Sequence, residues 1–178
     1  MFYSTDYASP VGPLRIASDG DSIIGLWLAD GHKYLPVNVV GEGEVRDDLP
    51  VLAAAVNWLE CYFNKQRPSI TELPLKPEGS TFRQEVWEIL CDIPYGEWIT
   101  YGEIARQMAS RRGKVKMSAQ AVGGAVGHNP ISIVIPCHRV IGTNGNLTGY
   151  GGGIERKVQL LEHEGVDVSQ FSLPKKRI

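Results

Sequence analysis

Cysteine is scarce in this chain of 178 residues, which has only Cys61, Cys91 and Cys137. An odd and widely spaced set of cysteines does not predict a disulfide framework, and no Cys-x-x-Cys pair suggests structural zinc. We therefore expect three free thiols, no metal and no other cofactor. Free thiols persist in a reducing compartment, so the cysteine content favours the cytoplasm.

Long apolar runs are also missing, and no stretch approaches the length needed to cross a membrane. The first six residues lack the cationic region and apolar core of a secretion signal. We find no internal repeats and no low-complexity tracts. With 43% hydrophobic and 21% charged residues, the composition is that of a soluble globular protein of one or two small domains.

A strong net charge is absent as well, since the formal charge of the whole chain is −2. The charge is unevenly distributed, however. Residues 1–80 contain 6 Lys/Arg and 11 Asp/Glu, whereas residues 81–178 contain 12 Lys/Arg and 9 Asp/Glu, giving −5 and +3. A surface that binds nucleic acid is therefore expected in the second half.

The first half has the pattern of a small sheet with one helix. Turn signals separate short apolar runs in residues 1–40, such as Leu14–Ala17 and Ile23–Leu28. Residues 41–50 are acidic and predict a loop, and apolar residues at helical spacing predict a helix over Leu49–Phe63. Three prolines between Pro68 and Ser80 predict a connecting segment.

The second half is predicted to be mostly helical. Its helix-start signals are Thr81 with Gln84, Thr100 with Glu103, and Ser118, whose helix would extend to Gly127. The last two of these helices, joined by residues 109–117, resemble a helix-turn-helix with a long connection. Asn144-Gly145 predicts a tight turn, and residues 154–164 predict a final helix ended by Gly165.

The segment Pro136–Val140 carries the main chemical signal. It places Cys137 between an apolar run, Ile131–Ile135, and the pair His138-Arg139. The run is β-branched and ends at a proline, which predicts a buried strand. Cationic neighbours lower the pKa of a thiol, and His138 would act on it through one water. From residue types alone, a buried core cysteine is an equal alternative.

Pro136–Val140 resembles the active-site pentapeptide of the O6-alkylguanine-DNA alkyltransferases, also called methylated-DNA–protein-cysteine methyltransferases. The resemblance is strong from about Thr81 to Gly165 and loose over the first 80 residues. Its other elements are Gly123-Gly124-Ala125, Asn129-Pro130, Ile141-Gly142, Thr148-Gly149-Tyr150, Gly152-Gly153 and Leu160–Gly165. The resemblance implies DNA repair by single-use, irreversible transfer of an alkyl group to the cysteine, after the base is flipped out of the duplex.

Pattern and resemblance together predict an α/β (α+β) fold. A β-rich, ribonuclease-H-like domain with one helix would occupy residues 1–75. A mostly helical domain with the helix-turn-helix-like element and the cysteine would occupy residues 76–170, followed by a tail at 171–178. The partner would be double-stranded DNA containing O6-alkylguanine, with O4-alkylthymine as a second candidate lesion, bound through its minor groove by a monomer with little sequence preference.

The family assigns a role to each matching residue. Cys137 would be the nucleophile and His138 the base, oriented by Glu164. Tyr101 would hold the guanine and supply the proton to it. The residues expected at substrate or DNA are Gln120, Ala121, Gly123, Gly124, Asn129, Val140, Tyr150 and Gly151. Arg111 and Lys114 are added to them from the basic segment 111–116, which the family does not match. Arg139 and Pro136 are expected to be structural.

Two departures from the family concern DNA binding. Gln120 stands where relatives often have an arginine that fills the space left by the flipped nucleotide, so we expect weaker base extrusion. The basic segment 111–116 is either a phosphate contact that partly offsets Gln120 or an ordinary solvated loop. Ser132 stands where some relatives have proline, so bulky benzyl groups should fit less well. The zinc ligands of some relatives are not matched, with only His32 nearby.

Two other functions remain open. A non-catalytic protein that binds alkylated DNA would keep the fold but replace the nucleophile, whereas Cys137 is present here. A cysteine hydrolase could use Cys137, His138 and Glu164, but it would leave the glycine-rich helix unexplained.

Overall fold

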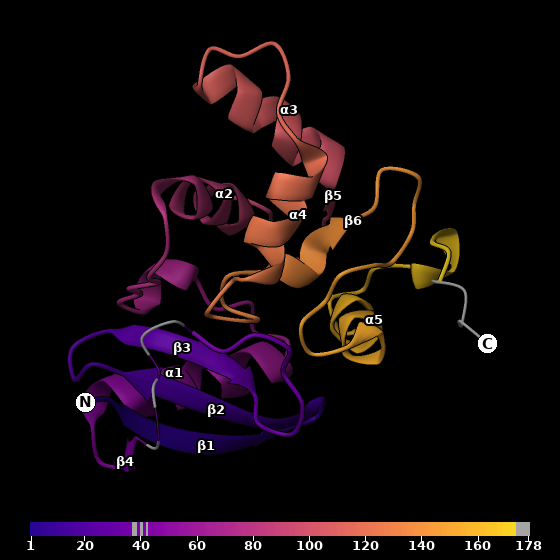
Figure 1. Ribbon diagram of the computed structural model, residues 1–178. Coiled ribbons are helices and arrows are strands. Elements are labelled where there is room, and N and C mark those ends of the chain that lie inside the picture. The colour runs from indigo at the N-terminus through magenta and orange to yellow at the C-terminus, as the bar shows by residue number, and fades with distance from the viewer. Residues whose placement is uncertain (37–38, 40, 42, 174–178) are drawn as a thin grey trace.

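The computed structural model describes residues 1–36, 39, 41 and 43–173 of the chain (Figure 1). A four-stranded sheet forms one end of the molecule, in the order β3-β2-β1-β4. Its strands are β1 (Tyr3–Ser9), β2 (Gly12–Ser18), β3 (Ile23–Leu28) and β4 (Glu44–Val45). The first three form an antiparallel meander in the region predicted to be β-rich, and β4, inside the predicted loop 41–50, pairs in parallel with β1.

Helix α1 (Pro50–Phe63) confirms the prediction for this part of the chain and packs on the three long strands. Pro50 suits its first turn because an amide there has no partner within the helix. The connection to the second half contains one short 3-10 turn, η1 (Ile70–Glu72). The predicted connecting segment is therefore irregular for most of its length.

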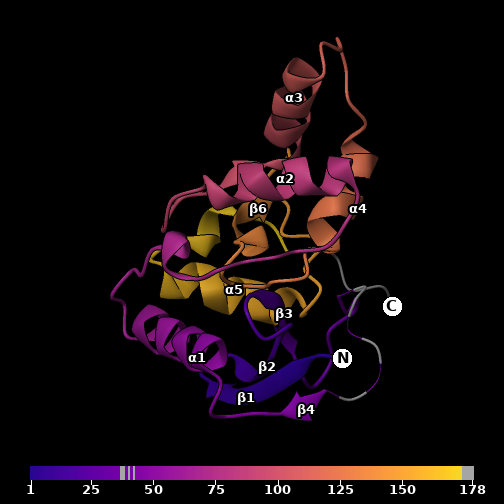
Figure 2. The same cartoon turned by 90° about the vertical axis from the view of Figure 1, so that its left-hand side faces the viewer.

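Four helices dominate the second half: α2 (Thr81–Cys91), α3 (Tyr101–Arg111), α4 (Ala119–Gly127) and α5 (Ile154–His163). The shorter elements are β5 (Ile99–Thr100), η2 (Cys137–Arg139), β6 (Val140–Ile141) and η3 (Val168–Gln170). Turning the molecule by 90° keeps α3 at the end opposite the sheet (Figure 2). The mixed α+β class predicted from the sequence is confirmed.

Two of the three predicted helix caps lie where the sequence placed them. The side chains of Thr100 and Ser118 accept hydrogen bonds from the amides of Glu103 and Ala121. The first cap was predicted one residue too late: Ser80, not Thr81, accepts from an amide of α2. A capping residue has an extended backbone, whereas Thr81 is already helical.

One continuous apolar core joins the two halves, and it includes Leu14 and Leu59 from the first half and Trp87 and Ile104 from the second. The edge of the sheet also touches the segment before the cysteine. Leu26 donates its amide to Pro130 and accepts from the amide of Ser132, both at 2.9 Å. The sheet therefore fixes the approach to Cys137.

The last described residues return to the second half instead of leaving it. Leu147 donates its amide to the carbonyl of Ser172 at 2.9 Å, and Phe171 packs edge-on against Trp98 at 5.0 Å. The first two residues of the predicted tail, Phe171 and Ser172, are thus anchored, and residues 174–178 lie outside the described part.

Candidate active site

The apolar segment before Cys137 is buried, but the strand predicted for it was wrong. Only Ile131 makes a β-bridge, and a tight turn follows in which Val134 donates its amide to Ser132 across Ile133. Ile133 has φ 69°, a strained backbone for a β-branched residue. Pro136, at φ −82° and ψ 66°, sits at the centre of a second such turn between Ile135 and Cys137. The residue types of this segment are those of a buried strand, so the sequence alone does not reveal the two turns.

Asn129 holds these turns together from the end of α4. Its side-chain amide donates to the carbonyl of Ile135 at 2.8 Å, while its Oδ1 accepts from the amide of Ile131 at 3.0 Å. Asn129 is itself buried. It therefore ties α4 to the segment that carries the cysteine.

Cys137 begins the 3-10 turn η2 and is 8% exposed. Burial raises the pKa of its thiol, while Asn129, the positive charge of Lys157 and the amides at the start of the turn act to lower it. Burial is the largest of these effects. The thiol is therefore predominantly protonated at neutral pH and needs a base to become a nucleophile.

His138 follows directly and is fully buried. Its Nε2 donates to Oε2 of Glu164 at 2.6 Å. Its Nδ1 has no hydrogen-bond partner among the described residues. Burial lowers the pKa of His138 despite the opposing effect of Glu164. The ring is thus neutral, with the proton on Nε2 and the lone pair on Nδ1.

Glu164, the residue that ends α5, collects donors from several parts of the chain. Arg139 contacts both of its oxygens, at 2.7 and 3.0 Å. The Tyr62 hydroxyl donates at 2.6 Å and the Gly96 amide at 3.2 Å. Burial would raise the pKa of this carboxyl, but the hydrogen bonds from His138 and Arg139 outweigh it and lower the pKa. Because His138 is neutral, we assign the charge contribution to Arg139.

Lys157 is a buried cation that the sequence analysis missed. Its Nζ donates to the carbonyls of Val140 at 2.6 Å and Thr148 at 2.8 Å. Burial lowers its pKa to about 8, although the nearby Cys137 acts in the opposite direction. A signal was present: Lys157 lies in the same helical stripe as Leu160, Leu161 and Glu164, where a buried side chain is expected.

Two tyrosines lie close to the thiol. The Tyr101 hydroxyl donates to the carbonyl of Thr148 at 3.2 Å, and burial, together with Cys137, raises its pKa to about 12. Tyr150 is 8% exposed, and its buried hydroxyl lies beside that of Ser132, which acts to lower the Tyr150 pKa. Burial and Cys137 raise the pKa of Tyr150 well above its ordinary value. Both hydroxyls are therefore donors at neutral pH.

The remaining predicted contacts fall into two groups. Val140 is buried directly after the thiol turn, the Gly151 carbonyl accepts from the amide of Lys33 at 2.9 Å, and Ser132 is buried with its hydroxyl beside that of Tyr150. On α4, by contrast, Gln120, Ala121 and Gly124 are exposed and Gly123 is half-buried. The structure thus separates a set of residues around the thiol from an open helix face.

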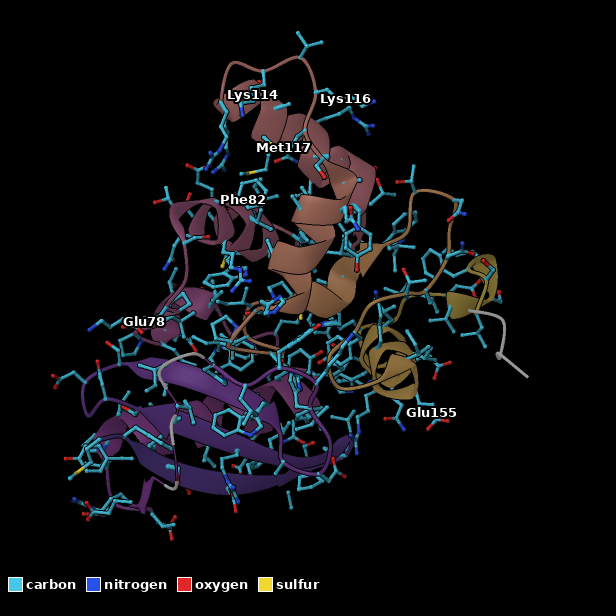
Figure 3. All side chains as sticks on the ribbon, viewed as in Figure 1. Glu78, Phe82, Lys114, Lys116, Met117 and Glu155 are labelled. Atoms are coloured by element: carbon cyan, nitrogen blue, oxygen red, sulfur yellow. The ribbon has the colours of Figure 1, made fainter. Side chains whose placement is uncertain are left out.

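The basic segment 111–116 also contains two groups of residues, a pair of arginines in ion pairs and a pair of exposed lysines. Arg111 and Arg112 form ion pairs of 3.1 Å with Glu88 and Glu85 of α2. Lys114 and Lys116 are exposed beyond the end of α3, and Figure 3 shows both at the far end of the molecule from the sheet.

The described residues contain no group of three or more His, Cys, Asp or Glu side chains able to hold a metal ion. Within the same part of the chain, no helix has the length and apolar character needed to cross a membrane. His32, the histidine considered for zinc, packs against Gly151 instead.

Tyr62 and Gly96 were also missed, and no sequence signal pointed to them. Tyr62 belongs to an ordinary amphipathic helix in the other half of the chain, and Gly96 contributes only its backbone amide to Glu164. Their roles depend on long-range packing.

Family comparisons cover almost the whole chain. Residues 1–77 match the family described as "6-O-methylguanine DNA methyltransferase, ribonuclease-like domain". Residues 81–166 match "6-O-methylguanine DNA methyltransferase, DNA binding domain".

Individual proteins are similar over the same span. A methylated-DNA–protein-cysteine methyltransferase of Haemophilus influenzae is 44% identical over 164 residues, covering 92% of this chain and 87% of the relative. The protein of that name from Methanosarcina acetivorans is 39% identical over 168 residues, covering 93% and 99%.

Two solved structures from Mycobacterium tuberculosis share the fold. The O6-methylguanine methyltransferase superimposes with a TM-score of 0.75 at 40% identity, covering 92% of this chain and 93% of that one. The OGT in complex with DNA gives 0.72 at 39% identity, covering 96% and 94%. The similarity includes both halves of the chain.

Proposed function

This chain belongs to the 6-O-methylguanine DNA methyltransferase family, and on that premise we propose which of its residues perform the reaction. The protein is a methylated-DNA–protein-cysteine methyltransferase, which repairs DNA by moving an alkyl group onto itself. We assign the acceptor to Cys137. The observation that carries this assignment is His138, whose Nε2 donates to the ionised Glu164 while Nδ1 remains free to accept a proton.

In the proposed step, His138 Nδ1 takes the thiol proton through one water, because neighbouring side chains do not face one another. The thiolate then attacks the O6-alkyl carbon of a guanine rotated out of the duplex. A sulfur–carbon bond forms, the carbon–O6 bond breaks, and its electron pair returns to the guanine. Tyr101, which is protonated at neutral pH because its pKa is raised to about 12, donates its proton to that leaving base, and the proton held by His138 returns to the Tyr101 oxygen through solvent. The thioether product does not hydrolyse, so each molecule acts once.

For the DNA, we propose that α4 enters the minor groove of a duplex containing O6-alkylguanine and that a monomer binds it. An added Cβ on Gly123, Gly124 or Gly127 would meet no atom within 4 Å, so this side of the helix is open to a close neighbour. Gln120, at the exposed start of the helix, is assigned to the space left by the flipped base. The three free thiols support a reducing compartment such as the cytoplasm.

An intact mass measurement after incubation with an oligonucleotide containing O6-methylguanine tests the assignment. We expect one added methyl group per protein, mapped to the peptide containing Cys137, and none in Cys137→Ser. A methyl group on Cys61 or Cys91 would reject the acceptor. Tight binding without any methyl gain would instead support the alternative of a non-catalytic lesion-binding protein.

A further inference from the structure

A groove of about 310 Å³ lies at the carboxyl end of α4. The glycines of α4 line one side of it, and Tyr150 with the adjoining glycines lines another. The remaining wall comes from the other half of the chain, through Lys33 and Tyr34. Residues distant in sequence thus meet where the glycine face of α4 adjoins the site of the thiol.

The Lys33-Tyr34 segment is held firmly in this position. The amide of Lys33 donates to the Gly151 carbonyl at 2.9 Å. The Tyr34 ring stacks on His128 with centroids 4.0 Å apart, and His128 Nδ1 donates to the carbonyl of Gly124 at 2.7 Å. Lys33 Nζ lies 5.1 Å from the centre of the Tyr34 ring. The ammonium group of Lys33 therefore lies beside α4, on a segment that these contacts hold in place.

Tyr150, on the wall of the groove, keeps its hydroxyl inside the protein. That hydroxyl is buried beside the equally buried hydroxyl of Ser132, which acts to lower the Tyr150 pKa. Lys33 is the lysine among the residues that line the groove, and its side chain is exposed.

The charge distribution around α4 indicates which group Lys33 would meet. No Lys, Arg, Asp or Glu occurs from Ser118 to His128, so α4 itself cannot neutralise phosphates. Lys114 and Lys116 lie beyond its amino end (Figure 3), and Lys33 lies at its carboxyl end. Lys33 is exposed and forms no ion pair with a described carboxylate.

Length supports the same arrangement. Nine helical residues extend about 14 Å, whereas the minor groove is about 6 Å wide. A helix crossing that groove therefore brings its two ends to the two phosphate backbones. The cations at the ends of α4 would each meet a different strand.

We propose that Lys33 binds a backbone phosphate of the DNA strand passing the carboxyl end of α4, with the Tyr34–His128 pair fixing its position. The amino-terminal half is then part of the DNA-binding surface and does more than support the second half. This inference rests on the proposed minor-groove binding by α4.

The test is the salt dependence of binding to an unmodified duplex, measured by fluorescence anisotropy with wild type, Lys33→Gln and Lys76→Gln. Lys76 is a matched control because it is exposed and lies beside Ile23, at the opposite end of β3. One lost phosphate contact should reduce the slope of log K against log salt by about 0.9 and weaken binding roughly eightfold at about 0.1 M salt. Lys76→Gln should change neither.

An unchanged slope for Lys33→Gln, or an equal change in Lys76→Gln, overturns the proposal while leaving the family activity intact. Failure of the wild type to bind duplex DNA at all would instead reject the proposed DNA-binding mode. Methyl transfer separates a local contact from misfolding. Lys33→Gln should still take up one methyl group at saturating DNA, and loss of that uptake would assign it a structural role and reject the phosphate contact.

Discussion

The Cys137 thiol lies among groups with opposing effects on its pKa. Its own burial raises the pKa, and Lys157 is the nearby positive charge that lowers it. Lys157 also donates to the carbonyls of Val140 and Thr148, which lie before and after the turn at Asn144-Gly145. One amine thus combines an electrostatic role with a geometric one.

We expect Lys157→Met to slow methyl transfer at pH 7 by about tenfold or more, because each unit by which a pKa rises leaves tenfold less thiolate. The pH profile of the transfer rate should move to higher pH. The buried carbonyl of Val140 also loses its donor, at a cost of about 1–3 kcal/mol.

Lys76→Met provides the control, since Lys76 is exposed and lies beside Ile23 of the sheet. A slower reaction with no movement of the pH profile would show that Lys157 acts through structure alone. The rates should be compared at a temperature where both variants are folded by circular dichroism.

At the scale of elements, α4 exposes Gln120 near its amino end. A charged donor forms stronger hydrogen bonds than a neutral amide. We expect Gln120→Arg to improve repair of a duplex by roughly fivefold, corresponding to about 1 kcal/mol. Single-turnover rates on duplex and single-stranded substrates measure the effect.

Only the duplex requires the base to be extruded, so repair of the single strand should change little. Equal repair of duplex DNA by Gln120→Arg and wild type would contradict a role for this position in extrusion.

The structure indicates which residues of the basic segment 111–116 would contact phosphate, a choice that the sequence left open. Arg111 and Arg112 pair with glutamates of α2, so we expect Lys114 and Lys116 to supply any phosphate contacts. The double variant Lys114→Gln/Lys116→Gln should lower the salt slope of DNA binding by up to about 1.8. Neutralising Arg111 and Arg112 should have a smaller effect, and the opposite ranking would assign the contacts to the arginines.

Prediction from sequence succeeded where the signals were local. The apolar stripe of α1 and the caps at Thr100 and Ser118 depend on neighbours within one helical turn. The turns around Ile133 failed because their apolar residues are identical in type to those of a strand. The strained backbone there is imposed by Asn129 and by the edge of β3. Tyr62 reaches Glu164 across 102 positions of sequence, which no pattern of spacing encodes.

For the whole molecule, acid should weaken the contact between the halves. His32 packs against Gly151, and burial, with the charge of Arg156 nearby, lowers its pKa to about 4. Arg156 also contacts Asp30 at 2.6 Å. A lowered histidine pKa means that the unfolded chain binds more protons between about pH 6.5 and 4. Stability is therefore complete above that range and falls as the pH decreases through it.

We expect the thermal midpoint of the wild type to decline from pH 6.5 to 4 and the decline to be smaller in His32→Gln. It should not vanish, because buried His138 acts in the same direction and Glu164 adds its own loss below about pH 4.5, as its lowered pKa requires. Parallel curves for the two proteins would show that His32 is not a source of the acid sensitivity.

The carboxylate of Glu164 is shared by donors from α1, from the turn before β5 and from the thiol segment. The peptide connection between residues 64 and 80 is therefore not what holds the halves together. A chain cut once in that connection should remain a single particle. Its two fragments, made separately, should reassemble through the contacts of Glu164. A protease would then have to cut elsewhere in the chain to inactivate the protein. Recovery of methyl transfer after the two fragments are mixed would show that the halves had reassembled.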